Sequence, residues 1–224
     1  MKIQFLGHSC FYLEENNFKA LIDPFMTGNE NCPLSPDDFS SITHIFVTHG
    51  HGDHLGDTIE IARKTNSMVI TNYEIACFLG TKDITTHPMH IGGRTSFDFG
   101  VVKMTPALHG SSIETTEGML YGGNPCGFVI KIGKNTIYHA GDTGLTMDMK
   151  LLERENIDLA LLPIGGNFTM DIEDASLAVD FIKPKKVIPM HYNTFPLIKA
   201  DPEKLKTQTS SEIIILNPGE TYTI

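Results

Sequence analysis

The feature that most constrains this chain is a long series of short strand-like runs, interrupted by only a few stretches of helical periodicity. The strand-like runs, which alternate or are rich in β-branched and aromatic residues, are 2–7, 11–15, 18–23, 44–49, 68–72, 95–100, 101–107, 127–133, 136–142, 157–164, 186–191, 211–217 and 221–224. The helical stretches are 57–66, 72–80, 171–182 and 201–209. Strands in two groups with interspersed helices predict an α+β fold in which two sheets pack face to face beneath outer helices.

The pattern runs through all 224 residues without an internal repeat or a low-complexity tract. We therefore expect a single domain over 1–224. Two long segments, 24–41 and 110–125, are rich in loop-forming residues, and we expect both to be loops of functional importance.

Composition and charge indicate where the protein acts in the cell and which kinds of partner it binds. No apolar run approaches the roughly 20 residues that span a bilayer, and the N-terminal "MKIQFLGHSC" enters a strand pattern without a signal-peptide signature. We therefore expect a cytoplasmic protein. The formal charge of −10, with only "KPKK" at 183–186 densely basic, disfavours nucleic acid and favours a small-molecule substrate. The cysteines form no C-x-x-C pair and are predicted to be buried or half-buried thiols: Cys10, Cys32, Cys77 and Cys126.

The segment "THGHGDHLGD" (48–57) concentrates potential metal ligands at the end of a strand. In an extended segment, residues two apart point the same way, so His49 and His51 can approach one cation. Asp53 and His54 follow just before a predicted helix, where adjacent side chains diverge toward a second cation. The glycines at 50 and 52 allow a tight turn here. Imidazole suits zinc and other first-row metals, and a carboxylate adds the charge that a second cation needs.

Four ligands are too few for two metal ions, and three further donors occur at the ends of other strands. His109 follows the run 101–107, Asp142 ends the run 136–142, and His191 ends the run 186–191. In a layered fold, a functional site usually lies where the ends of several strands converge.

These motifs resemble those of the metallo-β-lactamase-fold hydrolases, in the same order along nearly the whole chain: "LIDPF", "THGHGDHLGD", His109, "HAGDTG" and "PMH". "LGHSCF", "GGNPCGFVI", "LLPIGGNFTMDIEDA" and "PMHYNTFPLI" look typical of a group of small metal-dependent hydrolases in that superfamily, and the ascorbate-6-phosphate lactonase type is a second relative. The resemblance implies a four-layer αβ/βα sandwich. It also implies that His49, His51 and His109 bind metal 1, that Asp53, His54 and His191 bind metal 2, and that Asp142 bridges the two.

Other polar residues have predicted roles near such a site. His8, at the end of the first strand, is a candidate proton donor or substrate contact, and Asp53 is a candidate proton acceptor. Asp23 is expected to support a metal ligand from behind or to fix a loop, Asp57 to orient a ligand histidine or cap a helix, and His139 to lie in the core or behind the ligands. His44 is interpreted as structural, and His87 and His90 are expected to lie in a loop that connects strands, "HPMH" (87–90), without a metal role. The candidate substrate contacts are Asn124, Asn167, Thr169 and Asn193, with the turn "GGNFTM" (165–170) able to bind an anion at a helix start.

Taken together, the sequence predicts a metal-dependent hydrolase in which two cations activate a hydroxide for attack on a small polar ester, lactone or phosphodiester. Zinc is the expected metal, although Mn, Ni, Fe or Co would accept the same ligands. Three alternatives stay open. A nuclease of the same fold conflicts with the acidic charge. A di-iron redox protein conflicts with His51, where that group usually has a carboxylate. A non-catalytic metal-binding protein conflicts with the complete ligand set. A homo-oligomer is compatible with the two long loops.

Overall fold

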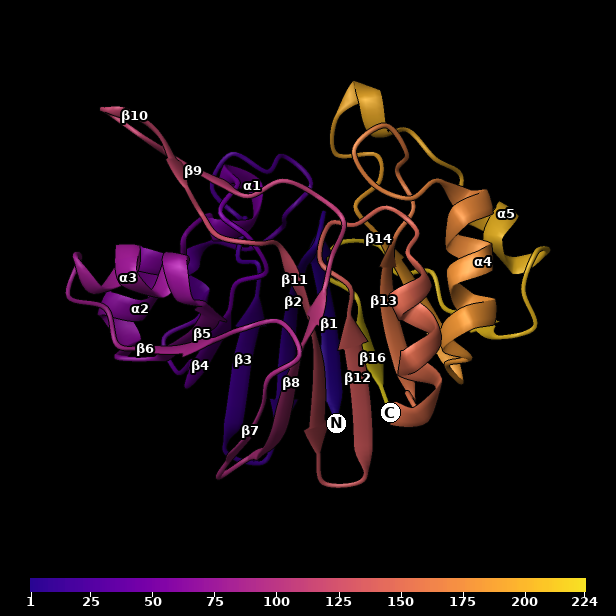
Figure 1. The fold of residues 1–224 in the computed structure, drawn as a ribbon, viewed down its shortest axis with the longest axis horizontal. Coiled ribbons are helices and arrows are strands. Elements are labelled where there is room, and N and C mark those ends of the chain that lie inside the picture. Colours follow the sequence, from indigo (N-terminus) through magenta and orange to yellow (C-terminus); the bar gives the residue numbers. More distant parts are fainter. The chain divides into compact units, whose positions relative to one another are not determined.

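The computed structural model describes residues 1–224, and the chain divides into two compact units that are interleaved along the sequence (Figure 1). Unit 1 comprises Met1–Ile91, Gly110–Pro125 and Asn217–Ile224, and unit 2 comprises Gly92–His109 and Cys126–Leu216. Whether 1–224 acts as one domain stays a prediction. None of the helices is long and apolar enough to cross a membrane.

Unit 1 is built on a seven-stranded mixed sheet with the order β16-β1-β2-β3-β4-β5-β6. The strands are β1 (Lys2–Gly7), β2 (Cys10–Glu15), β3 (Phe18–Ile22), β4 (His44–Phe46), β5 (Met68–Asn72), β6 (Thr86–Met89) and β16 (Thr221–Thr223). Strands β3 to β6 are parallel, so the chain must cross back between them, and the helices α2 (Thr58–Thr65) and α3 (Tyr73–Gly80) make two of these crossings. Their apolar residues pack in one buried cluster with those of the sheet, including Leu21, Ile45, Ile61, Val69, Ile75 and Leu79. A short 3₁₀ turn, Pro36–Asp38, interrupts the loop that follows β3.

Unit 2 contains a second seven-stranded mixed sheet, with the order β15-β14-β13-β12-β11-β8-β7. The strands are β7 (Arg94–Phe97), β8 (Gly100–Pro106), β11 (Cys126–Ile132), β12 (Asn135–His139), β13 (Leu159–Pro163), β14 (Lys186–Met190) and β15 (Glu212–Ile213). Strands β12 to β15 are parallel, and β13 is buried at every position, as expected for a parallel strand covered on both faces. The helices are α4 (Ile172–Ile182), α5 (Glu203–Lys206) and the 3₁₀ segments Met147–Glu155 and Pro196–Ile198.

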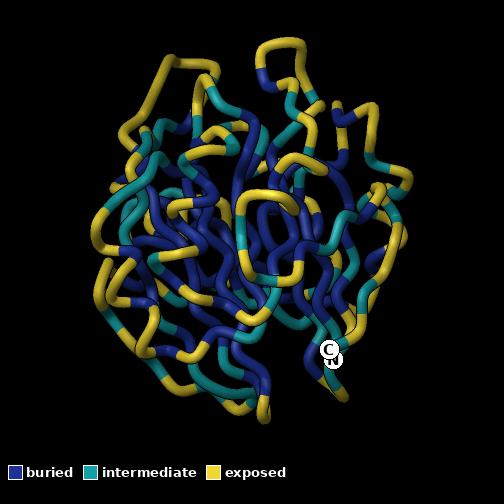
Figure 2. Tube along the Cα trace, turned by 90° about the vertical axis from the view of Figure 1, so that its right-hand side faces the viewer, coloured by how far each residue is buried: buried dark blue, intermediate teal, exposed yellow.

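The predicted α+β class with two mixed sheets is confirmed. In Figure 2, buried residues (dark blue) run through the interior of the trace, and exposed residues (yellow) lie mostly on its outer bends. Two predicted loops are wrong. Residues 110–125 contain the hairpin of β9 (Ser112–Thr115) and β10 (Gly118–Tyr121), and 87–89 belong to the edge strand β6. The hairpin forms a two-stranded sheet of its own, and β6 lies at an edge of the unit 1 sheet, so polar and exposed residues hide the strand pattern in both. Cys77 is also exposed on α3, contrary to the prediction.

Unit 2 carries an ion cluster in which one nearly buried carboxylate meets three cations. Glu155, with an 8% exposed side chain, contacts Arg94 (2.6 Å), Lys103 (2.9 Å) and Lys131 (3.0 Å), which project from three neighbouring strands. Burial alone would raise the pKa of Glu155, but the hydrogen bonds from Lys103, Lys131 and Arg94 lower it from 4.5 to about 2. The cluster therefore holds the 3₁₀ segment Met147–Glu155 onto the sheet.

We expect Glu155→Gln to lower the free energy of unfolding by about 1–3 kcal/mol at pH 7, because three clustered cations lose their counter-charge. Since the folded pKa is lowered, this contribution is present above the ordinary value of 4.5 and disappears as the pH falls from 4.5 to about 2. Urea unfolding at pH 7 and pH 3 should therefore show a difference that shrinks at pH 3. Glu153→Gln, which removes an exposed pair with Lys183, is the matched control. A difference of equal size at both pH values would contradict the prediction.

Candidate metal centre

Residues 48–57 of unit 1, called the metal-binding loop because they include four of the predicted ligands, continue from β4 and turn into the short helix α1 (Gly52–Leu55). His51 is the N-cap residue of α1, and Asp53 and His54 lie within its single turn. A Cβ on Gly50 would approach Ile113 Cγ1 to 2.8 Å, and a Cβ on Gly56, which has φ of +40°, would approach the Pro24 carbonyl oxygen to 2.3 Å. Gly52 has nothing within 4 Å. Close packing against other segments thus requires glycine at 50 and 56 but not at 52.

His49 and His51 converge on each other through different ring nitrogens. His49 Nε2 lies 3.1 Å from His51 Nδ1. Two nitrogens bound to one tetrahedral zinc ion at about 2.0–2.1 Å lie roughly 3.3 Å apart. The pair therefore has close to the spacing that a shared metal ion would need, as the alternation of an extended segment predicts.

A buried carboxylate behind the loop orients two of its histidines. Asp23 Oδ1 accepts from the Thr48 amide (2.8 Å), and Asp23 Oδ2 accepts from the Thr48 hydroxyl (2.6 Å) and from His54 Nδ1 (2.8 Å). Because Thr48 donates its single hydroxyl proton to Asp23, it accepts from His49 Nδ1 at 3.0 Å. His49 and His54 thus carry their protons on Nδ1, which leaves Nε2 as the ring atom with which each could bind a metal ion.

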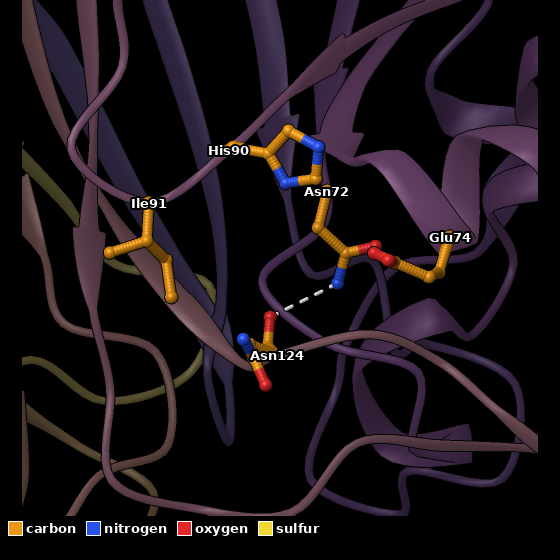
Figure 3. A pocket seen from close by; sticks show the side chains of 5 residues that line it. All are labelled: Asn72, Glu74, His90, Ile91 and Asn124. Carbon is orange, nitrogen blue, oxygen red and sulfur yellow. Dashed lines mark hydrogen bonds between the residues drawn. The ribbon is translucent and has the colours of Figure 1, made fainter.

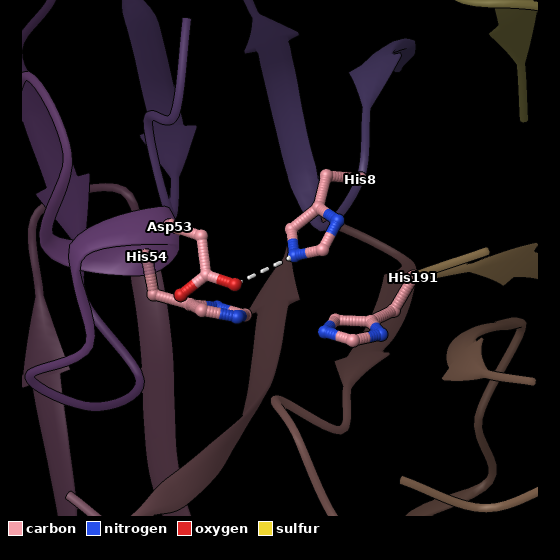
Figure 4. Close-up of side chains that lie close together, drawn as sticks. All are labelled: His8, Asp53, His54 and His191. Carbon is pink, nitrogen blue, oxygen red and sulfur yellow. Dashed lines mark hydrogen bonds and ion pairs between the residues drawn. The ribbon is translucent and has the colours of Figure 1, made fainter. Parts of the chain in front are cut away.

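His8 and Asp53 meet above the same helix turn (Figure 4). His8 lies in the two-residue turn between β1 and β2 with φ of +57°, and it is 1% exposed. Its Nε2 lies 3.2 Å from Asp53 Oδ2, and its ring packs edge-on against Phe25 and His54. The ligand atoms of His8, Asp53 and His54 all lie within 4.8 Å of one another. His8 is therefore close enough to act on Asp53 or to serve as a ligand beside it.

Asp57 occupies the N-cap position of α2, as predicted, but its side chain neither caps the helix nor is seen to orient a ligand histidine. Its carboxylate instead accepts from the backbone amides of Met26 (3.0 Å) and Thr27 (2.9 Å). It thereby fixes the start of the 24–41 loop beside the metal-binding loop. The prediction failed because these partners are 30 and 31 residues away in sequence.

In unit 2, the two predicted histidine ligands, His109 and His191, approach the same carboxylate oxygen of the third predicted ligand, Asp142. Asp142 Oδ2 lies 2.9 Å from His191 Nε2 and 3.7 Å from His109 Nε2. Asp142 and His191 are nearly buried, at 3% and 2% exposed. His191 directly follows β14, and Asp142 follows β12 in a turn held by the Gly141 amide donating to His139 Nδ1 (3.1 Å). The buried His139 therefore supports the turn rather than joining the ligands.

The predicted substrate contacts are more dispersed. Asn124, in unit 1, is exposed and accepts from the Tyr121 hydroxyl, and Asn193, in unit 2, is exposed and accepts from the Ala200 amide. Asn167 and Thr169 lie before α4. The N-terminus of α4 is occupied by Asp171, whose carboxylate accepts from the Asp174 amide at 2.9 Å. Of the remaining histidines, His44 contacts Thr43 and has a pKa lowered by burial, and His90 stacks on Tyr73.

Two residues that support the metal-binding loop were not predicted. Thr48 links Asp23 to His49, and the Ser111 hydroxyl accepts from the Gly50 amide at 3.1 Å. Thr48 adjoins the ligand motif and Ser111 lies far from it in the sequence. Neither residue belongs to a recognisable motif, so a single sequence does not distinguish it from other serines and threonines.

Known proteins are similar to this chain over most or all of its length. The family model described as "Beta-lactamase superfamily domain" matches residues 19–192. A UPF0173 metal-dependent hydrolase from Alkaliphilus metalliredigens is 62% identical over 99% of both chains, and one from Carboxydothermus hydrogenoformans is 52% identical over 98% of both. Igni18, a metallo hydrolase from Ignicoccus hospitalis, is 35% identical and superimposes with a TM-score of 0.89, covering 100% of this chain and 98% of that one. The chain therefore belongs to the beta-lactamase superfamily and, within it, to the UPF0173 metal-dependent hydrolase family, which confirms the resemblance of its motifs.

Proposed function

We propose that this protein is a hydrolase that holds a pair of divalent metal ions through its predicted histidine and aspartate ligands. His49, His51 and His109 would bind metal 1, Asp53, His54 and His191 would bind metal 2, and Asp142 would bridge them. The chemistry of these donors fits the group, because imidazole nitrogens and carboxylate oxygens bind zinc and other first-row metals. Family membership supports the same conclusion.

The observation that carries the proposal is the position of Asp142. One oxygen of this carboxylate faces both His191 Nε2 at 2.9 Å and His109 Nε2 at 3.7 Å, the two imidazoles that the proposal assigns to different metal ions. A single oxygen between one ligand of each metal is what a bridging carboxylate requires. The 3.1 Å approach of His49 to His51 supports the first metal position independently.

When bound, two divalent ions would supply a water of lowered pKa as the nucleophile and polarise the bond to be cleaved. The chain's own residues then manage protons and orientation. Asp53 accepts the proton of the attacking water, and His8, 3.2 Å from Asp53, carries a proton on Nε2 toward the leaving group. Asn124, Asn167, Thr169 and Asn193 contribute hydrogen bonds to the substrate. The substrate class is a small polar ester, lactone or phosphodiester, and zinc is the expected metal.

The proposal is tested by metal analysis of the purified protein, followed by an ester, lactone and phosphodiester panel on that metal form. We expect about two divalent ions per chain and hydrolysis of at least one substrate class. His51→Ala should lower the metal content and abolish the activity, because it removes a ligand of metal 1. His87→Ala, at a half-buried histidine of the edge strand β6, is the matched control and should change neither quantity. Wild-type activity in folded His51→Ala protein, or metal-free wild-type protein with full activity, would overturn the proposal.

A further inference from the structure

The Ser111 hydroxyl connects the metal-binding loop to the β9–β10 hairpin. The Gly50 amide donates to Ser111 Oγ at 3.1 Å, and the Ser111 hydroxyl donates to the Gly122 carbonyl at 2.8 Å. Gly50 lies between His49 and His51, so its peptide orientation sets how these two rings approach each other. Ser111 thus contacts the backbone between two proposed ligands without contacting either ring.

The Gly122 carbonyl that receives this hydroxyl is itself held by a buried side chain. Asn72, 3% exposed, donates from Nδ2 to the carbonyls of Gly122 (2.7 Å) and Asn124 (3.1 Å; Figure 3). Its Oδ1 accepts from the Ile75 amide at 2.8 Å and caps the N-terminus of α3. Ser111 is therefore linked through Gly122 and Asn72 to the capped start of α3.

Packing around these hydrogen bonds leaves little room for adjustment. A Cβ on Gly50 would lie 2.8 Å from Ile113 Cγ1 and 2.9 Å from the Ser112 carbonyl oxygen, and a Cβ on Gly122 would lie 2.8 Å from Ser111 Oγ. The metal-binding loop and the base of the hairpin thus lie so close together that a side chain at Gly50 or Gly122 would clash. A lost hydroxyl at 111 would leave the Gly50 amide without this acceptor at a close-packed point.

We propose that Ser111 is a positioning residue for the metal-binding loop. By accepting from the Gly50 amide and donating to the Gly122 carbonyl, its hydroxyl holds the Gly50 peptide in the orientation that brings His49 Nε2 and His51 Nδ1 to 3.1 Å. The inference rests on the proposed metal centre. It adds a residue that acts on metal affinity through the backbone.

The test is chelator competition for zinc with the full-length protein, using Ser111→Ala, Ser111→Thr and Ser112→Ala. We expect Ser111→Ala to bind zinc about 10–100-fold more weakly, the range found for groups that orient metal ligands. Ser111→Thr keeps the hydroxyl and should retain the affinity. Ser112 has the same residue type one position along the chain and makes no side-chain hydrogen bond, so Ser112→Ala should match the wild type. If Ser111→Ala does not fold, Asn72→Ser, which keeps a cap for α3 but loses the donors to Gly122, should weaken zinc binding in the same direction.

The failures of the two proposals are distinguishable. Wild-type protein that binds no zinc would overturn the metal centre and this inference with it. Zinc binding by the wild type with equal affinity in Ser111→Ala would overturn only the role of Ser111. An equal loss of zinc affinity in Ser112→Ala would also overturn the role of Ser111, because it would reflect a general disturbance of β9.

Discussion

Asp142→Asn is expected to lower the hydrolytic kcat/KM by on the order of 10³-fold or more and to reduce the bound metal from two ions to one or fewer. Asparagine has nearly the same shape but carries no negative charge, and one of its two terminal atoms is a donor. It therefore cannot place an anionic oxygen between His109 and His191, where Asp142 Oδ2 now lies 3.7 Å and 2.9 Å from their Nε2 atoms. Metal analysis and steady-state kinetics on the same preparation measure both effects.

The matched control for this variant is Asp180→Asn, which makes the same chemical change at an exposed position on α4. It should leave metal content and kinetics unchanged. The melting temperature of the metal-free Asp142→Asn protein shows whether the fold persists. Two bound ions and near-normal turnover in a folded Asp142→Asn protein would be incompatible with a bridging role.

Asp23→Asn is expected to have the second-largest effect, and it should act on stability and on metal affinity together. The carboxylate is fully buried and accepts from the Thr48 amide, the Thr48 hydroxyl and His54 Nδ1. An amide has one acceptor atom, so at least one buried donor loses its partner, at a cost of about 2–4 kcal/mol in the free energy of unfolding. His49 and His54 also lose the contacts that fix their tautomers, which should weaken metal binding about 10–100-fold.

Denaturant unfolding with a chelator present measures the stability effect of Asp23→Asn without a contribution from bound metal. Chelator competition then measures the affinity effect. Asp98→Asn, an exposed aspartate in unit 2, is the control for the chemical change. If Asp23→Asn destabilised the metal-free protein but bound zinc as tightly as the wild type, Asp23 would be a loop-fixing residue with no influence on the ligands.

The two predictions differ in how much of their basis is visible in the sequence. Asp142 was identified because it ends a strand-like run, as do His49 and His191, and strand ends meet at one edge of a sheet. The role of Asp23 depends on contacts with Thr48 and His54, 25 and 31 residues away, which no local pattern encodes. The interpretation of Asp57 as a helix cap failed for the same reason, since its partners Met26 and Thr27 lie on another loop.

The secondary structure shows the same division. Runs such as 2–7, 68–72 and 186–191 were placed within a residue of their observed bounds, because apolar alternation and β-branched residues reflect burial against a sheet. The β9–β10 hairpin was predicted as a loop because β10, "GMLY", is exposed at all four positions and has no buried face to give it a pattern. Strand β6, at one edge of the unit 1 sheet, was missed for a similar reason, because only one of its four residues is buried.

By itself, the sequence determined the fold class, the family and the residue types that can bind metal, because each is written in local periodicity or in a motif of a few residues. Only the tertiary structure decided which ring nitrogen each histidine presents, that Asp142 faces both His109 and His191, and that Ser111 contacts the backbone of Gly50. These features depend on hydrogen bonds between segments up to 61 residues apart. Such contacts form only when packing brings the segments together, and a hydroxyl or carboxylate that makes them looks no different in the sequence from one that does not.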